Sequence, residues 1–225
     1  MASFEYHVNV AVIATGVLIT PVYSSGLIDV NQSLIILGLG LVGGILPDLD
    51  SDNSKPIQII FKMLSIFLPL LVLISINKEF PVLHLIGIWI VSTLVLQLLF
   101  FQLFLKLTSH RGIFHSIPMG IFLAQIVILL FYRVLDQNLT FSTIAGSFLF
   151  IGFIVHLLLD ELVSVNALGF KMKKSFGSAL KLYDKNNISG TVVLYALIAV
   201  LFFLTPQKEE VYLNLFEIFK NIKFI

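Results

Sequence analysis

Long apolar stretches separated by short polar segments constrain the fold more than any other feature of this sequence. The longest extends from Pro81 to Leu107 and contains a single charged residue, a lysine close to its end. A helix of about 20 such residues crosses the hydrocarbon core of a bilayer, where backbone polar groups must be bonded within the protein. The stretches do not alternate with polar residues, which argues against a β-barrel. We therefore predict an all-α fold, a polytopic transmembrane helical bundle forming a single membrane-embedded domain over residues 1–225.

The apolar stretches predict about seven helices. Three of them, the first, second and fifth, are short for a membrane span, so whether they cross fully is left open. Residues 206–225 follow as a short amphipathic tail, which we expect to lie in the membrane interface because its polar side chains share one helical stripe. The seven expected helices are Val8–Tyr23, Ser33–Leu46, Ile57–Ile76, Pro81–Leu107, Ile117–Tyr132, Phe141–Val163 and Ile188–Thr205.

The composition excludes several classes of protein. Charged residues make up 12% of the chain and hydrophobic residues 58%, whereas soluble domains carry about 25% charged residues. Such a chain cannot cover the surface of a soluble enzyme with polar groups. Its net charge of +1 provides no general field for binding a polyanion, so no nucleic-acid partner is expected. The absence of cysteine excludes disulfides, thiolate metal sites and cysteine nucleophiles.

The distribution of basic residues predicts the orientation. If all seven helices cross, most of the 14 lysines and arginines fall in loops on one side. The positive-inside rule makes that side cytoplasmic and places the N-terminus there, in a bacterial-type cytoplasmic (inner) membrane. The basic residues on this side are Lys55, Lys62, Lys106, Arg111, Lys171, Lys173, Lys174, Lys181 and Lys185.

Histidines and aspartates gather at one end of the predicted bundle. Ionisable residues in or near membrane spans are costly and usually functional. With alternating crossings, four separate segments bring such groups to the predicted cytoplasmic side, while His84, Asp29 and Asp136 fall on the other. The gathered residues are His7 at the start of the first helix, Asp48 and Asp50 at the end of the second, His110, Arg111 and His115 in the loop before the fifth, and His156 and Asp160 near the end of the sixth.

The spacing of these residues suits metal binding. His156 and Asp160 are four apart on one helical face, so either both bind one ion or the aspartate orients the histidine. Pro47 favours an irregular helix end, at which Asp48 and Asp50 reach one centre or bridge two. Gly112 lets the loop that carries His110 and His115 turn back. Nitrogen and oxygen donors without sulfur fit Zn, Mn or Fe. Because a mononuclear catalytic zinc site needs about three protein ligands, the candidates are enough for one or two divalent ions.

The segments also resemble a known family. His7, the sequence GGILPDLDSDNS at 43–54, HRGIFHS at 110–116 and HLLLD at 156–160 occur here in that order. Over residues 5–165 the chain is similar to the LexA-binding, inner-membrane-associated hydrolase family (YdjM-like), described as membrane-bound metal-dependent hydrolases. The chain departs from the family pattern at Phe114, where Thr is frequent, and at Ser51, where His is frequent. The resemblance implies these metal ligands: His7, Asp48, Asp50, His110, His115, His156 and Asp160.

The leading hypothesis is a membrane-embedded, metal-dependent hydrolase with its site at the cytoplasmic end of the bundle. A lipid, or a lipid-linked ester or phosphoester, would be the substrate, and membrane lipids the partners. Asp50 or Asp160 would serve as general base. Arg111 would bind an anionic group of the substrate, or serve only as a basic anchor.

Two other functions remain compatible with the sequence. One is a divalent-metal or proton-coupled transporter, although transport requires polar groups near the membrane midplane and access from both faces. The other is a non-catalytic, metal-stabilised membrane scaffold, in which protein ligands would fill every coordination position.

Overall fold

The computed structural model describes residues 4–50, 81–100, 112–166, 171–172 and 180–206, and a few positions between 62 and 73. Within these residues the fold is all-helical except for one antiparallel pair of two-residue strands, which confirms the predicted class. Most of the predicted third helix, residues 101–107 and the tail from 207 onward lie outside the described residues. The elements are α1 Phe4–Ser24, α2 Val30–Ile45, the 3₁₀ helix η1 Leu46–Asp50, α4 Val82–Val95, the π-helix η2 Leu96–Phe100, α6 Ile117–Leu129, the π-helix η3 Leu130–Val134, α7 Leu139–Ser164, β1 Val165–Asn166, β2 Lys171–Met172 and α8 Ile188–Leu204.

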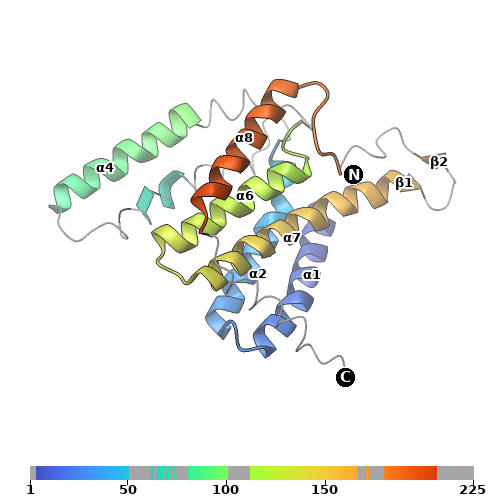
Figure 1. Cartoon of the computed structure of the whole chain (residues 1–225), viewed down its shortest axis with the longest axis horizontal. Helices are drawn as coiled ribbons and strands as arrows, with labels where there is room; N and C mark the ends of the chain where they lie inside the picture. Colours follow the sequence, from blue (N-terminus) through green and yellow to red (C-terminus); the bar gives the residue numbers. More distant parts are fainter. Residues whose placement is uncertain are drawn as a thin grey trace.

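Helix α7 is the centre of the bundle (Figure 1). It packs against α1, α2 and α6, and α8 packs on the outer side of α6. Helix α4 stands apart from this bundle and buries none of its residues (Figure 1). The order of elements therefore places the start of α1, the end of α2, the start of α6 and the end of α7 together, as alternating crossings require.

The expectation that the first, second and fifth helices are short is wrong. Apolar helical segments long enough to span a membrane cover Glu5–Ser24, Val30–Asp48, Ile117–Val134 and Leu139–Val163. Polar residues at helix ends explain the difference, because hydropathy assigns them to loops. Helix α2, for example, begins three residues early, after Asp29, whose carboxylate accepts a hydrogen bond from the backbone of Gln32 in a capping box. At the other end, the 3₁₀ turn η1 and the π-turn η3 prolong α2 and α6.

Glycines allow α2 and α7 to touch along their backbones. A Cβ atom on Gly43 would overlap the carbonyl oxygen of Leu149, and one on Gly152 would overlap the carbonyl oxygen of Gly40. Lipid tails are as apolar as the helices, so no hydrophobic effect draws the helices together in a membrane. Close packing of this kind is therefore a main source of their association. Because Gly152 is four residues before His156, the same contact presses the face of α7 that carries His156 against the end of α2.

We expect Gly43→Ala to weaken the bundle because its methyl group meets backbone that cannot move away. Overpacking of this kind costs about 1–3 kcal/mol of unfolding free energy. Gly38→Ala on the same helix is the matched control, since its Cβ would meet nothing within 4 Å. Unfolding in mixed detergent and SDS micelles measures both variants. Equal stability of the two would contradict the contact between α2 and α7.

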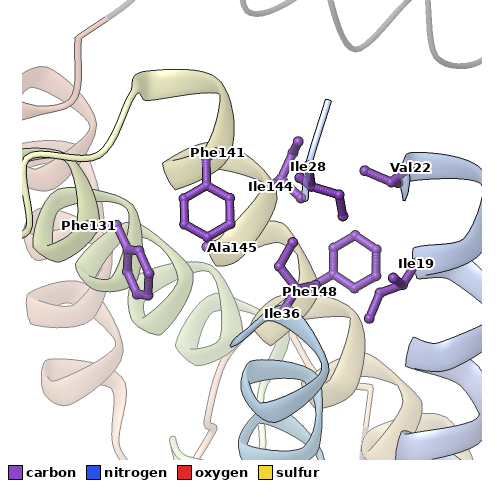
Figure 2. Close-up of a cluster of buried hydrophobic side chains, with 9 residues drawn as sticks. All are labelled: Ile19, Val22, Ile28, Ile36, Phe131, Phe141, Ile144, Ala145 and Phe148. Carbon is purple, nitrogen blue, oxygen red and sulfur yellow. The ribbon is translucent and has the colours of Figure 1, made fainter. Parts of the chain in front are cut away.

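A hydrophobic cluster fills the end of the bundle opposite to the start of α1 (Figure 2). It joins the end of α1 to the start of α2, the end of α6 and the start of α7, with three phenylalanine rings at its centre. A second cluster, around Met119, Phe153, Leu157 and Leu194, links α6, α7 and α8. The members of the first cluster are Ile19, Val22, Ile28, Ile36, Phe131, Phe141, Ile144, Ala145 and Phe148.

Candidate metal centre

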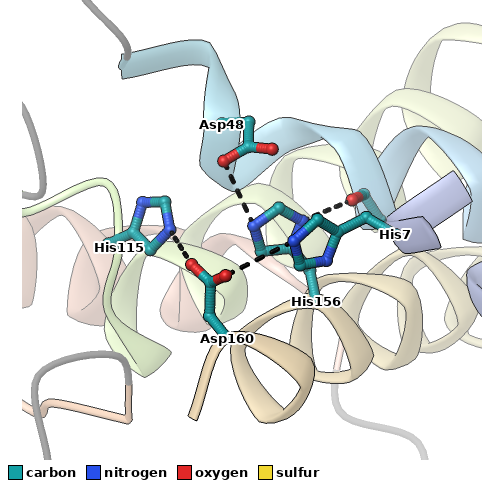
Figure 3. Close-up of polar contacts among 6 residues, drawn as sticks. His7, Asp48, His115, His156 and Asp160 are labelled. Atoms are coloured by element: carbon teal, nitrogen blue, oxygen red, sulfur yellow. Dashed lines mark hydrogen bonds and ion pairs between the residues drawn. The ribbon is translucent and has the colours of Figure 1, made fainter. Parts of the chain in front are cut away.

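Three histidines and two aspartates meet at the other end of the bundle (Figure 3). They come from four places in the chain, as the sequence predicted: His7 from the first turn of α1, Asp48 from η1, His115 from the turn before α6, and His156 and Asp160 from α7. The backbone N–H of His115 donates to the carbonyl of Gly112, which closes the expected turn. The convergence of these five groups is thus confirmed.

Asp160 lies between two imidazole rings. Its Oδ1 is 3.4 Å from His7 Nε2, and its Oδ2 is 3.5 Å from His115 Nε2. Asp48 Oδ1 is 3.4 Å from His156 Nε2 in the same way. The rings of His7 and His156 are stacked, with centroids 3.8 Å apart, and that of His115 stands edge-on to His156 at 5.5 Å. The five side chains therefore form a single cluster.

This cluster is closed to solvent except at one aspartate. His156 is fully buried, and His7, His115 and Asp160 are almost so. The side chain of Asp48 is 30% exposed. Among the five groups, Asp48 is therefore the one in contact with solvent.

The backbone of α2 fixes the orientation of His156. Its Nδ1 lies 2.7 Å from the carbonyl oxygen of Gly44. Because a carbonyl can only accept a hydrogen bond, Nδ1 donates, and in the neutral ring the lone pair is left on Nε2. Nε2 faces Asp48 and the rest of the cluster. Metal-binding histidines are typically held by such a bond from the ring nitrogen that does not bind the ion.

The distances between the donor atoms suit shared coordination of a divalent ion better than they suit hydrogen bonds between the side chains. N–H···O hydrogen bonds are usually 2.7–3.2 Å long, so separations of 3.4–3.5 Å are too long for good ones. Tetrahedral ligands about 2.0–2.2 Å from an ion are themselves about 3.3–3.6 Å apart. His156 Nε2 and Asp160 Oδ1 are buried and make no hydrogen bond among the described residues. An unbonded buried polar atom costs about 1–3 kcal/mol, and binding an ion would remove that cost.

Two overlapping sets of side chains are placed to hold an ion. One consists of His7, His156 and Asp160, and the other of Asp48, His115 and His156. His156 belongs to both, yet only its Nε2 is available, because Nδ1 is bonded to Gly44. Among the described residues, two ions could not each take three ligands from these sets.

The remaining predicted site residues are not described. The backbone of Asp50 ends η1, but its side chain lies outside the described part, as do His110 and Arg111 entirely. His84 lies on α4, away from the cluster, in agreement with its predicted exclusion. Asp29 and Asp136 lie in the turns at the opposite end, also as predicted.

The backbone before Pro47 departs from the usual geometry, and one contributor to the site was missed. A proline disfavours helical geometry in the residue before it, but Leu46 is helical (φ −54°, ψ −40°) and the chain continues as a 3₁₀ turn. A backbone hydrogen bond from Leu46 N–H to the carbonyl of Val42 holds this conformation. No role in the site was predicted for Gly44. Its carbonyl could not be found from sequence, because every residue has one.

These features define a class of protein, a polytopic helical membrane protein with a buried His/Asp cluster positioned to hold a metal ion. Residues 1–211 match the family model described as YdjM inner membrane protein, and the chain belongs to that family. This confirms the resemblance at the level of the family and of the membrane, while hydrolysis and LexA binding stay predictions. No match was found among curated proteins or among solved structures.

Proposed function

We propose that the protein is a metal-dependent hydrolase whose centre lies at one end of the membrane bundle. The observation that carries the proposal is the set of five buried or half-buried donor groups, separated by 3.4–3.5 Å within each pair. The chemistry of the donors, imidazole and carboxylate without sulfur, suits Zn, Mn or Fe. Because both donor sets need the same His156 nitrogen, we propose one ion for the described residues.

The residues of the cluster divide into two roles in this proposal. A bound divalent ion would supply Lewis-acid polarisation of the scissile bond and activation of water. His7, His156 and Asp160, the buried one of the two donor sets, would hold it, and His115 would position Asp160 through its second oxygen. Gly44 would keep His156 in the tautomer that presents Nε2. The low exposure of these four side chains would exclude bulk water from the ion.

Asp48 is the better candidate for a general base. Both oxygens of Asp160 lie near imidazole nitrogens, so that carboxylate is committed to the cluster. Asp48 approaches one imidazole through Oδ1 and is the exposed member. Its second oxygen would take the proton from an attacking water, as the geometry of general-base catalysis requires. Asp48 was predicted only as a metal ligand; Asp50 and Arg111, which were predicted with Asp160 as catalytic residues, keep those roles as predictions.

The position of the centre suggests an amphipathic substrate. The cluster lies at the ends of apolar helices long enough to span a membrane, where acyl chains and polar headgroups meet. Large apolar side chains of α7, Leu158 and Leu162, are exposed at the same end of the helix as Asp160, on its outward face. A lipid, or a lipid-linked ester or phosphoester, can lie along such a surface with its polar group at Asp48. We propose that this end faces the cytoplasm, following the positive-inside rule.

Metal content and hydrolysis, measured on the same purified protein, test the proposal. We expect about one equivalent of Zn, Mn or Fe by elemental analysis. Hydrolysis of 4-methylumbelliferyl phosphate, 4-methylumbelliferyl butyrate or vesicle phosphatidylglycerol should require that metal. Asp48→Asn should keep the metal and lose at least about 100-fold in rate, the usual contribution of a general base. A protein that binds no divalent metal would refute the proposal.

The same purified protein distinguishes a hydrolase from the two alternatives, a scaffold and a transporter. A scaffold would hold metal without turnover of any probe. A transporter would move Zn²⁺ or Mn²⁺ across liposome membranes. The hydrophobic cluster at the far end of the bundle, with three phenylalanines (Figure 2), disfavours a path for ions through this part of the protein.

A further inference from the structure

Pro47 lies between Gly44 and Asp48, the two residues that face the ring nitrogens of His156. It follows Gly44 by three positions and precedes Asp48 by one. It is fully buried, and it occupies the second position of η1, where α2 changes from α-helical to 3₁₀ geometry. Proline has no backbone N–H, so it withholds one hydrogen bond from whichever carbonyl it would otherwise serve.

Helix geometry identifies the carbonyls that lose a backbone hydrogen-bond donor because residue 47 is proline. In an α-helix each N–H bonds to the carbonyl four residues earlier, so Pro47 withholds a donor from Gly43. In a 3₁₀ helix the partner is three residues earlier, which is Gly44. The chain adopts 3₁₀ geometry at this point. In this geometry the Asp48 N–H, which an α-helix would direct to Gly44, serves Ile45 instead, so neither residue 47 nor residue 48 supplies a donor to the Gly44 carbonyl.

The deprived carbonyl is the one that His156 uses. A buried carbonyl without a donor costs free energy, so it favours any donor within reach. His156 Nδ1 is 2.7 Å away, on a different helix and 112 residues later in the chain. The bond fixes the ring as the Nδ1–H tautomer and turns Nε2 toward Asp48. Pro47 also starts the turn that puts Asp48 opposite that nitrogen.

We propose that Pro47 is a positioning residue for the metal centre, acting through the Gly44 carbonyl on the tautomer of His156. It touches neither ion nor substrate in this role. The inference rests on the proposed function only in taking Nε2 of His156 as the atom that faces the metal. The proposed effect of Pro47, which leaves the Gly44 carbonyl to accept from His156, does not depend on whether the protein hydrolyses a substrate.

The test is the tautomer of His156 in metal-free protein labelled with ¹⁵N-histidine and purified in detergent micelles. The shifts of Nδ1 and Nε2 distinguish the two neutral tautomers, and His156→Asn assigns the signals. We expect the Nδ1–H form in the unaltered chain. Pro47→Ala adds an N–H that competes for the Gly44 carbonyl, so the Nε2–H form should become detectable. Zn²⁺ affinity, measured by calorimetry, should fall about 10–100-fold, as for loss of an outer partner of a metal-binding histidine.

Pro118→Ala is the matched control. Pro118 is also fully buried and lies in the first turn of α6, beside the cluster. A proline there withholds nothing, because the first N–H groups of a helix have no carbonyl to serve. This variant should leave the tautomer unchanged. The inference is overturned if Pro47→Ala keeps a pure Nδ1–H ring and full Zn²⁺ affinity. It is overturned equally if the unaltered chain carries the Nε2–H form, a measurement that does not depend on how Pro47→Ala folds. Absence of hydrolysis with the expected tautomers would refute the proposed function alone.

Discussion

His156→Asn should abolish tight metal binding and leave the bundle folded. The amide nitrogen of Asn takes the place of Nδ1 and can still donate to the Gly44 carbonyl, but nothing replaces Nε2. Both sets of candidate ligands contain this nitrogen, so no alternative set of three remains among the described residues. The loss of affinity should exceed the roughly 10–100-fold cost of removing an outer partner. Calorimetric titration with Zn²⁺ and with Mn²⁺ measures it.

His156→Ala provides the comparison that separates the two roles of this ring. Both variants lose Nε2, but the alanine variant also leaves the buried Gly44 carbonyl without its donor. It should therefore be less stable than His156→Asn by about 1–3 kcal/mol in metal-free micelles. If the asparagine variant bound Zn²⁺ as tightly as the unaltered chain, the assignment of His156 as the shared ligand would be wrong.

Asp160→Asn should have the second-largest effect, because it removes the one carboxylate that lies between two imidazoles. Loss of a negative charge in a buried site leaves the charge of a divalent ion less well compensated. We expect Zn²⁺ affinity to fall by at least about 100-fold, or about 2.7 kcal/mol. In the unaltered chain, saturating Zn²⁺ should raise the unfolding temperature, since it binds only the folded state. The variant should show little such increase at the same Zn²⁺ concentration.

Asp29→Asn is the control for Asp160→Asn. It removes one carboxylate at the opposite end of the bundle and retains the N-cap of α2, because Asn caps helices as well as Asp does. The Zn²⁺-dependent increase in unfolding temperature should be unchanged in this variant. An equal loss in both variants would mean that Zn²⁺ acts through general charge and not through the cluster.

The helices and the end at which the site forms were predictable because both follow from simple constraints. Apolar stretches in a membrane must be helical, and consecutive spans alternate in direction. Those two rules were enough to bring His7, Asp48, His115, His156 and Asp160 to one end. The different positions of the two aspartates within the cluster were not predictable. That Asp160 lies between two histidines while Asp48 remains exposed depends on side-chain positions that spacing along the chain does not determine.

The helix ends were the least accurate part of the prediction, for a physical reason. Hydropathy counts polar residues as loop, yet polar residues such as Asp29 and Gln32 hold a helix terminus by bonding its free N–H groups. Turns of a different pitch, such as η1 and η3, prolong helices without a distinctive composition. The contribution of Gly44 escaped prediction because a backbone carbonyl becomes distinctive only when its usual donor is missing.

The assembly of the centre from four separate segments also sets the time at which it can form during biosynthesis. His7, in α1, leaves the ribosome before the other donors, and His156 and Asp160 follow about 150 residues later, or roughly 7–30 s at ordinary rates of translation. During that interval a newly made chain offers no complete set of donors to an ion. Metal must therefore enter after α7 has been inserted beside α1 and α2. Under the proposed function, cells short of metal would accumulate inserted but metal-free protein, held together by its glycine contacts and hydrophobic clusters.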